Sequence, residues 1–196
     1  MMTIVLFIVI AYLIGAIPCG VILTRLAGGE DVRKAGSGNI GATNVYRVAG
    51  RKLGVITLLL DTLKGVIPVL IAVKLFPGNM TAIALVAAAT FLGHLFPVYI
   101  GFKGGKGVAT ALGIFLVLSP LAILIALVLF ISVVWQWRYI SLGSITAAAA
   151  CPFLIALVEN SFPLFLAGLF IGGMVIYRHR CNIQRLREGT ENKFTL

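Results

Sequence analysis

The chain has 196 residues, of which 60% are hydrophobic and 11% charged, and its mean hydropathy is +1.09. Soluble domains have about 45–50% apolar and about 25% charged residues, so this chain has too few polar groups for a water-exposed surface. The composition therefore excludes an ordinary soluble protein and predicts an integral membrane protein. The net charge of +10 lies in short segments between apolar runs. This pattern argues against nucleic-acid binding and favours a membrane face that also suits an anionic substrate.

Metal and disulfide chemistry have little support in the composition. The chain has six acidic residues, too few for the carboxylates of a metal-dependent membrane phosphotransferase. Cys19, Cys151 and Cys181 have neither metal-site spacing nor the even number that disulfides require. We therefore expect no metal, no cofactor and three free thiols.

Long apolar runs predict the membrane spans. The fourth run is too long for one span of about 20 residues. Pro120 interrupts it, and proline suits the start of a helix but disfavours helix at the residue before it. We therefore divide this run into a short helix, 107–118, and a full span, 120–137. The other spans are predicted at about 1–24, 53–76, 81–99, 144–158 and 162–177.

The basic residues decide between six and seven spans. With seven spans, fourteen of the sixteen Lys and Arg residues lie in four segments that share one side of the membrane. With six spans, the basic residues outside the spans divide eight to seven between the two sides. Positive residues concentrate on the cytoplasmic side of membrane proteins. The sequence predicts an all-α integral membrane protein with seven transmembrane helices, the N-terminus outside, the C-terminus cytoplasmic and a short fourth helix. We expect a single membrane-embedded domain over residues 1–196.

The first predicted cytoplasmic loop contains GSGNIGATNVYR over residues 36–47. Its G-x-G-x-x-G pattern is not surrounded by strand alternation, so we reject a dinucleotide site. Glycines let backbone N–H groups approach an anion, small polar side chains add donors, and Arg47 can bind a phosphate bidentately. The alternative is a flexible, solvated connector. The candidate anion-binding residues are Gly36, Ser37, Gly38, Asn39, Gly41, Thr43, Asn44 and Arg47.

The second predicted cytoplasmic loop lies within GHLFPVYIGFKGGKGVAT, residues 93–110. Gly104, Gly105 and Lys106 precede the short helix, and a glycine-rich backbone with a lysine at a helix N-terminus can bind an anion. The spacing is not that of a Walker A loop. His94 either binds a ligand or is hydrogen-bonded between helices. No aspartate follows it at the spacing of an H-x4-D acyltransferase dyad.

Further candidates lie in the third loop and in the C-terminal tail. Ser141 and Ser144, in the segment RYISLGS, are three residues apart and therefore lie on one helical face. His179 and Asn182 share a face of the basic tail and could reach a ligand. The charge of this tail is explained most simply as a topology anchor near anionic lipid.

Asp61 and Lys64 are charged residues inside the second predicted span. A charge within the membrane is by default a candidate functional group. An ion pair with a purely structural role explains both residues more simply, and we favour that interpretation.

The motifs GSGNIGATNVYR, GHLFPVYIGFKGGKGVAT and RYISLGS, with the tail HRCNIQRLREGTENKF, resemble those of the bacterial acyl-phosphate:glycerol-3-phosphate acyltransferases, the PlsY family. The resemblance runs from about residue 25 to the C-terminus. It implies a seven-helix enzyme that transfers a fatty acyl group from acyl phosphate to the 1-hydroxyl of sn-glycerol 3-phosphate, giving lysophosphatidic acid and phosphate. We expect a monomer in the bacterial cytoplasmic (inner) membrane, with its active site at the cytoplasmic face and membrane lipid beside it.

The resemblance also assigns roles to residues. By analogy, the donor phosphate is placed on the loop 37–41 with Lys106, Ser141 and Ser144, and glycerol 3-phosphate near Arg47, Lys106, His179 and Asn182. We expect Ser37, Lys106 and His179 to be catalytic. The other candidates are expected to bind substrate in the same cationic pocket: Gly36, Gly38, Asn39, Gly41, Thr43, Asn44, Arg47, His94, Gly104, Gly105, Ser141, Ser144 and Asn182.

Two alternatives remain open at this point. The phosphate of glycerol 3-phosphate is our hypothesis for the base that removes the hydroxyl proton, and His94 or His179 is the rival base. The competing function is an anion transporter, which would be expected to place its site at broken helices near the membrane midplane. The glycine and basic clusters here fall on one predicted face, which favours chemistry at the membrane surface.

Overall fold

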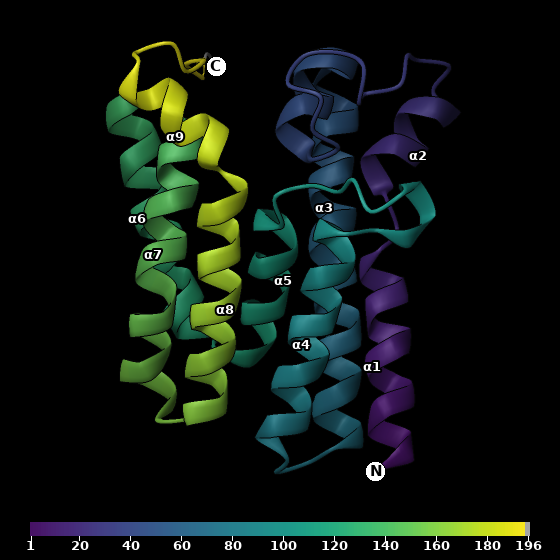
Figure 1. Cartoon of the computed structure of the whole chain (residues 1–196). Helices are drawn as coiled ribbons and strands as arrows, with labels where there is room; N and C mark the ends of the chain where they lie inside the picture. The colour runs from purple at the N-terminus through teal and green to yellow at the C-terminus, as the bar shows by residue number, and fades with distance from the viewer. Residues whose placement is uncertain (195–196) are drawn as a thin grey trace. The chain divides into compact units, whose positions relative to one another are not determined.

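The structure is a computed structural model that describes residues 1–194, and these residues form helices and loops without a β-strand (Figure 1). The prediction of an all-α protein is confirmed. The chain divides into two compact units, unit 1 (Met1–Val117) and unit 2 (Leu118–Leu196). Each unit has its own packed helices.

Unit 1 is built around close packing of its first helix against its fourth. A Cβ atom at Gly15 would clash with the Thr90 carbonyl, and one at Gly93 would clash with the Tyr12 carbonyl. Small residues at such contacts let membrane helices pack closely where lipid offers no hydrophobic driving force. The helices of this unit are α1 (Met2–Gly15), α2 (Cys19–Leu26), α3 (Ala42–Leu75), α4 (Met80–Leu95), the 3-10 turn η1 (Val98–Ile100) and α5 (Val108–Leu118).

The first apolar run, predicted as a span over about 1–24, is broken into two helices. α1 and α2 meet at an angle of 41° across a short break. Pro18 has no backbone N–H and cannot continue the hydrogen-bond ladder of α1. The carbonyl of Ile17 accepts a hydrogen bond of 2.7 Å from Lys64 Nζ of α3. A buried cation on a neighbouring helix therefore stabilises this break.

α3 begins at Ala42, well before the predicted span at 53. It contains a second break, at Gly50, that separates the segment before it from the apolar span. Gly50 has φ 86° and ψ 169°, which is not helical. A Cβ atom at Gly54, beyond the break, would lie 2.6 Å from Tyr46 Cβ, so the two parts of α3 pack against each other. A short helical segment, residues 42–49, therefore precedes the apolar part, and it carries the buried Asn44 and the exposed Arg47.

Unit 2 contains α6 (Pro120–Trp137), α7 (Ile140–Glu159), α8 (Phe162–Arg178) and α9 (Arg180–Arg187). α7 contacts both α6 and α8. The predicted division of the long apolar run is confirmed, because α5 ends at Leu118 and α6 begins at Pro120. Figure 1 shows α9 and the link between α6 and α7 at the same end of this unit.

The helices account for four to six membrane passes in the part of the chain that the structure describes. Four are long and apolar enough alone, and the bent pairs α1–α2 and α8–α9 raise the number to six. α5 is a shorter apolar helix of 11 residues. Counting it as the short fourth pass gives the seven that the basic residues predict, and this number and the orientation of the termini stay predictions.

Candidate active site

The glycine-rich loop before α3 is organised by one buried side chain. Asn44 is 2% exposed, and its Oδ1 accepts a hydrogen bond of 2.8 Å from the backbone N–H of Ser37. Asn44 therefore closes the loop, because its amide bonds to backbone on both sides of the glycines. Its Nδ2 donates to the carbonyls of Val32, Ala35 and Asn39 at 3.0, 3.1 and 2.8 Å.

The tip of this loop has a backbone shape that only glycine adopts easily. Gly36 and Gly38 have φ of 59° and 69°, on either side of Ser37, and all three residues are exposed. A side chain costs about 1–2 kcal/mol in this left-handed conformation. Gly41 caps the N-terminus of α3, where unpaired backbone N–H groups favour anions. The loop, this helix terminus and the exposed Arg47 thus provide donors suited to a phosphate.

The second glycine-rich segment of unit 1 is fixed to the end of α4. The N–H groups of Gly104 and Gly105 donate to the carbonyls of Leu95 and His94, each at 3.2 Å. Both glycine-rich segments lie toward the end of unit 1 opposite the N-terminus (Figure 1). His94 is 3% exposed and lies beneath Gly105, so in this structure its ring contacts the loop.

In unit 2, the tail residue Glu191 lies among three donors. Its Oε1 accepts from Ser141 Oγ at 2.8 Å and from Asn182 Nδ2 at 2.6 Å, and its Oε2 accepts from Arg185 Nε at 2.7 Å. The Glu191 side chain is 6% exposed. Burial acts to raise the pKa of Glu191, but hydrogen bonds from Asn182, Ser141 and Arg185 outweigh it and hold the pKa below its usual value. The carboxylate therefore ties α7 and α9 together.

The other two candidates of unit 2 are also buried. His179, at the junction of α8 and α9, is 3% exposed, and its Nδ1 lies 2.8 Å from the Val175 carbonyl. A carbonyl can only accept, so Nδ1 carries the hydrogen and Nε2 is the acceptor nitrogen of the neutral ring. Ser144 donates to the Ile140 carbonyl at 2.9 Å within α7.

Glu191 is the organising residue that motif reasoning missed. The signal available in the sequence was its charge, since it is one of six acidic residues and lies in a basic tail. The structure brings together Ser141, Asn182 and Glu191 in unit 2, and Ser37, Asn39 and Asn44 in unit 1.

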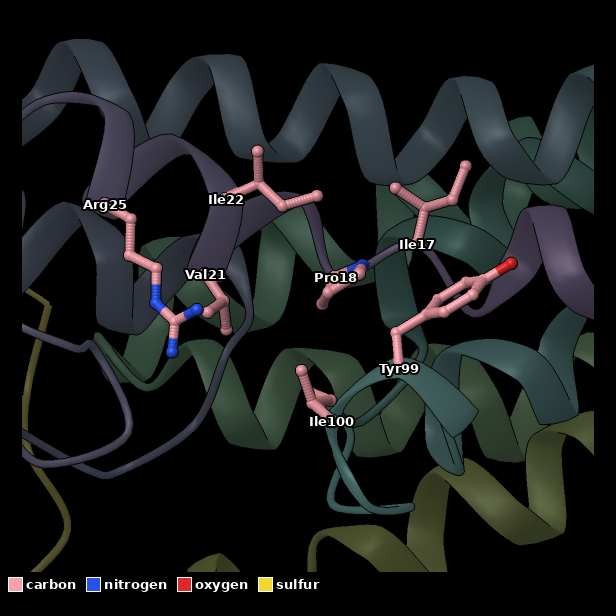
Figure 2. Close-up of a pocket in the computed structure, with 7 residues that line it drawn as sticks. All are labelled: Ile17, Pro18, Val21, Ile22, Arg25, Tyr99 and Ile100. Carbon is pink, nitrogen blue, oxygen red and sulfur yellow. The ribbon is translucent and has the colours of Figure 1, made fainter.

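Unit 1 also has an apolar groove at the break between α1 and α2, with a volume of about 320 Å³. Figure 2 shows Arg25 at one end and Tyr99 at the other, with aliphatic side chains between them. Arg25 lies 3.5 Å from Asp31, and its side chain is 62% exposed. The groove thus offers an apolar floor with a cationic end. The residues between are Ile17, Pro18, Val21, Ile22 and Ile100.

Together these features define a helical integral membrane protein with phosphate-type loops and buried polar side chains at helix ends. The family model described as glycerol-3-phosphate acyltransferase matches residues 5–189. The chain belongs to this family, as its motifs predicted.

Curated relatives agree with this assignment. Glycerol-3-phosphate acyltransferase of Syntrophotalea carbinolica is 63% identical over 94% of each chain. The protein of the same name from Geobacter sulfurreducens is 57% identical, again over 94% of each chain.

Two solved structures of PlsY (YgiH), an integral membrane glycerol 3-phosphate acyltransferase, have the same fold. The glycerol 3-phosphate form matches with a TM-score of 0.95 and 42% identity, covering 98% of this chain and 96% of that one. The lysophosphatidic acid form matches with a TM-score of 0.92 and 41% identity, with the same coverage. This chain is accordingly a multi-pass membrane protein of the acyltransferase class.

Proposed function

We propose that the protein transfers a fatty acyl group from acyl phosphate to the 1-hydroxyl of sn-glycerol 3-phosphate. The products are 1-acyl-glycerol 3-phosphate (lysophosphatidic acid) and inorganic phosphate. One observation carries most of this proposal: the chain has the fold of a PlsY structure described as its glycerol 3-phosphate form, at 42% identity over nearly the whole chain.

The loops of unit 1 support the phosphate-binding part of the proposal. Ser37 lies at an exposed turn between two glycines in the left-handed conformation, and Arg47 is exposed one helical turn beyond Asn44. We assign Ser37, Lys106 and Arg47 to direct contact with phosphoryl groups. Asn44 keeps a supporting role, because its amide is bonded to the loop backbone.

In unit 2 we assign substrate contacts to Ser141, Ser144, His179 and Asn182. All four are at least nine-tenths buried, and three of them lie at the junctions of α7, α8 and α9. Glu191 holds Ser141 and Asn182 in place.

The chemistry proposed is direct acyl transfer without an acyl-enzyme. The 1-hydroxyl oxygen bonds to the acyl carbonyl carbon, the bond from that carbon to the phosphate oxygen breaks, and phosphate leaves with the electron pair. Lys106 and backbone N–H donors stabilise the leaving phosphate and the developing oxyanion. The hydroxyl proton passes to the phosphate of glycerol 3-phosphate. Because acyl phosphate is already activated, positioning and charge stabilisation supply most of the acceleration.

The rival base can be tested directly. His179→Ala and His94→Ala each remove one candidate imidazole, and turnover at saturating substrate is compared with the wild-type protein. The substrate-assisted mechanism predicts losses of less than about 10²-fold, since general base catalysis contributes about 10²–10⁴-fold. A loss at the upper end of that range, with glycerol 3-phosphate binding intact, would assign the base to that histidine.

The defining experiment is an assay of purified protein with palmitoyl phosphate and labelled glycerol 3-phosphate. We expect labelled lysophosphatidic acid, and none when palmitoyl-CoA replaces palmitoyl phosphate. Product from the CoA ester would overturn the donor assignment. In liposomes, phosphate flux without acyl transfer would instead establish the anion transporter.

We also propose that the enzyme is a monomer in the inner membrane with its loops on the cytoplasmic side. The orientation is supported by the positive-inside distribution of the basic residues. A Cys181→Ser background with Lys34→Cys, at an exposed loop position, tests the orientation. A membrane-impermeant thiol reagent should label it in inverted vesicles and not in intact spheroplasts.

A further inference from the structure

Asp61 and Lys64 form an ion pair inside α3 that the proposed reaction does not use. Lys64 Nζ lies 2.8 Å from Asp61 Oδ1, and the side chains are 5% and 2% exposed. The lysine has a clear structural role, since it also donates to the Ile17 carbonyl at the break of the first span. Its positive charge offsets the carboxylate in apolar surroundings. The aspartate needs its own explanation.

A second polar neighbour of Asp61 is the imidazole of His94, on α4. Nδ1 of His94 lies 3.8 Å from Asp61 Oδ1, and this ring is 3% exposed. The backbone carbonyl of Asp61 also accepts a hydrogen bond of 3.1 Å from Thr110 Oγ1 of α5. Asp61 is thus the place where three helices of unit 1 meet through polar groups.

The opposite edge of the His94 ring lies against the glycine-rich loop. A Cβ atom at Gly105 would overlap Nε2 and would lie 3.0 Å from Cε1 and 3.2 Å from Cδ2. The N–H of Gly105 donates to the backbone carbonyl of His94 at 3.2 Å. The imidazole therefore fills the space between the Asp61 carboxylate and the loop residue that precedes Lys106.

We propose that Asp61 is a positioning residue that acts through His94 on the Gly104–Lys106 segment. The Asp61 oxygen, at 3.8 Å, is beyond direct hydrogen-bond distance of Nδ1, but it attracts an N–H there electrostatically and so favours the ring tautomer with its hydrogen on Nδ1, which leaves Nε2 as the acceptor nitrogen facing the loop backbone. A carboxylate behind a histidine fixes the orientation of the ring in this way in many sites. The ring in turn sets the path of the loop, and the loop sets the position of the Lys106 ammonium.

This inference rests on the proposed function, because its readout is acyl transfer. A single Asp61 variant would leave Lys64 as an unpaired buried charge, and loss of folding would then obscure the result. Two neutral double variants avoid this problem. Asp61→Leu with Lys64→Leu removes the polar oxygen that faces His94 Nδ1, whereas Asp61→Asn with Lys64→Leu keeps one.

The comparison is made on kcat/KM for glycerol 3-phosphate, with the thermal unfolding midpoint measured for each protein. We expect the Asn variant to be at least about tenfold more active than the Leu variant at similar midpoints, because small misplacements of a catalytic group cost up to about 10²-fold. The same pair is then made with His94→Leu. There the difference should disappear, since the group through which Asp61 acts is gone.

Equal activity of the two double variants would overturn the proposal. So would a difference of the same size in the His94→Leu background, which would mean that Asp61 acts by another route. Failure of the proposed function is a separate result, because the wild-type protein would then make no lysophosphatidic acid in the same assay.

Discussion

The glycine-rich loop before α3 in unit 1 and the Glu191 cluster of unit 2 differ in what holds their polar groups in place. The Glu191 cluster consists of Glu191 and its donors Ser141, Asn182 and Arg185. Both prepare polar groups at the end of a helix. The loop does so with backbone conformation and one neutral amide, Asn44, and leaves its tip exposed. The cluster does so with a buried carboxylate that holds three side-chain donors.

This difference indicates how each region should respond to change. The conformation of the glycine-rich loop depends on whether a side chain can be accommodated at its glycines, and a substitution there should disturb only the loop. A cluster built on a buried charge depends on protonation, because one proton on Glu191 weakens three hydrogen bonds at once. Substitutions in the loop should therefore affect substrate handling, and substitutions in the cluster should affect stability as well.

The largest expected effect on activity comes from removing the positive charge of Lys106 or of Arg47 in unit 1. Lys106→Met and Arg47→Met should each lower kcat/KM by about 10²–10³-fold, the size seen when one donor to a developing charge is removed. Thermal unfolding should change little. Lys103→Met, at an exposed position in the same loop, is the matched control and should keep its activity. A decrease in kcat/KM of less than tenfold for both variants would show that these loop cations do not take part in the reaction, and would contradict the role proposed for the loop.

Glu191→Gln should have the next largest effect, on stability. Charge-assisted hydrogen bonds contribute about 1.5–3 kcal/mol each, so loss of the charge should lower the unfolding midpoint clearly. The folded-state pKa of Glu191 is depressed. Its contribution is therefore complete above the unfolded value, about 4.3, and is lost as pH falls through the folded pKa.

Unfolding midpoints measured from pH 7 to pH 3 test this prediction. The wild-type protein should lose more stability than Glu191→Gln over that interval. Glu188→Gln is the control, because Glu188 is exposed and accepts only from Gln184 among the contacts identified. Parallel curves for wild type and Glu191→Gln would show that the carboxylate does not hold the cluster.

A smaller effect distinguishes the two glycines of the loop. Gly36→Ala should raise the KM for acyl phosphate about tenfold. The Cβ of the introduced alanine would clash with Asn44 Oδ1, and the positive φ at this position adds strain. Gly38→Ala has the strain and a milder contact, 3.3 Å from the Arg33 carbonyl. Gly78→Ala, with φ 77° and open space around it, controls for strain alone. Equal kinetics for Gly36→Ala and Gly78→Ala would contradict the role of Asn44.

The smallest effect is expected in the apolar groove of unit 1. The apolar floor and cationic end of this groove suit an acyl phosphate, so Ile22→Trp, which fills part of the groove, should reduce activity with palmitoyl phosphate by several-fold and leave a short-chain acyl phosphate unaffected. Ile10→Trp, at a similarly exposed position on α1, should alter neither substrate. Kinetics with donors of two chain lengths give the answer, and an unchanged chain-length profile would exclude acyl binding in this groove.

The local features of the fold were predictable from the sequence. Composition gave the all-α membrane class, Pro120 gave the division between α5 and α6, and the motifs gave the family. The break at Pro18 was missed because it lies within a long apolar run. Its compensating group, Lys64, is 47 residues away from Ile17.

The same limit applies to the candidate site. Residue types and spacing identified side chains suited to a phosphate, but they did not separate contact residues from supporting ones. Asn44 bonds to the loop that precedes it, and Glu191 reaches Ser141 across 50 residues. Such pairings depend on tertiary packing, and local sequence patterns carry no information about them.

The lysine at the first break has a consequence for biogenesis. The bend between α1 and α2 emerges from the ribosome well before Lys64, so at first the Ile17 carbonyl can accept only from the nearby Cys19 N–H, which lies 3.1 Å from it in the folded structure. The Lys64 ammonium adds a charged donor, and a hydrogen bond to a charged group contributes about 1.5–3 kcal/mol. The bend of the first segment therefore gains its full stability only when the segment that carries Lys64 packs beside it.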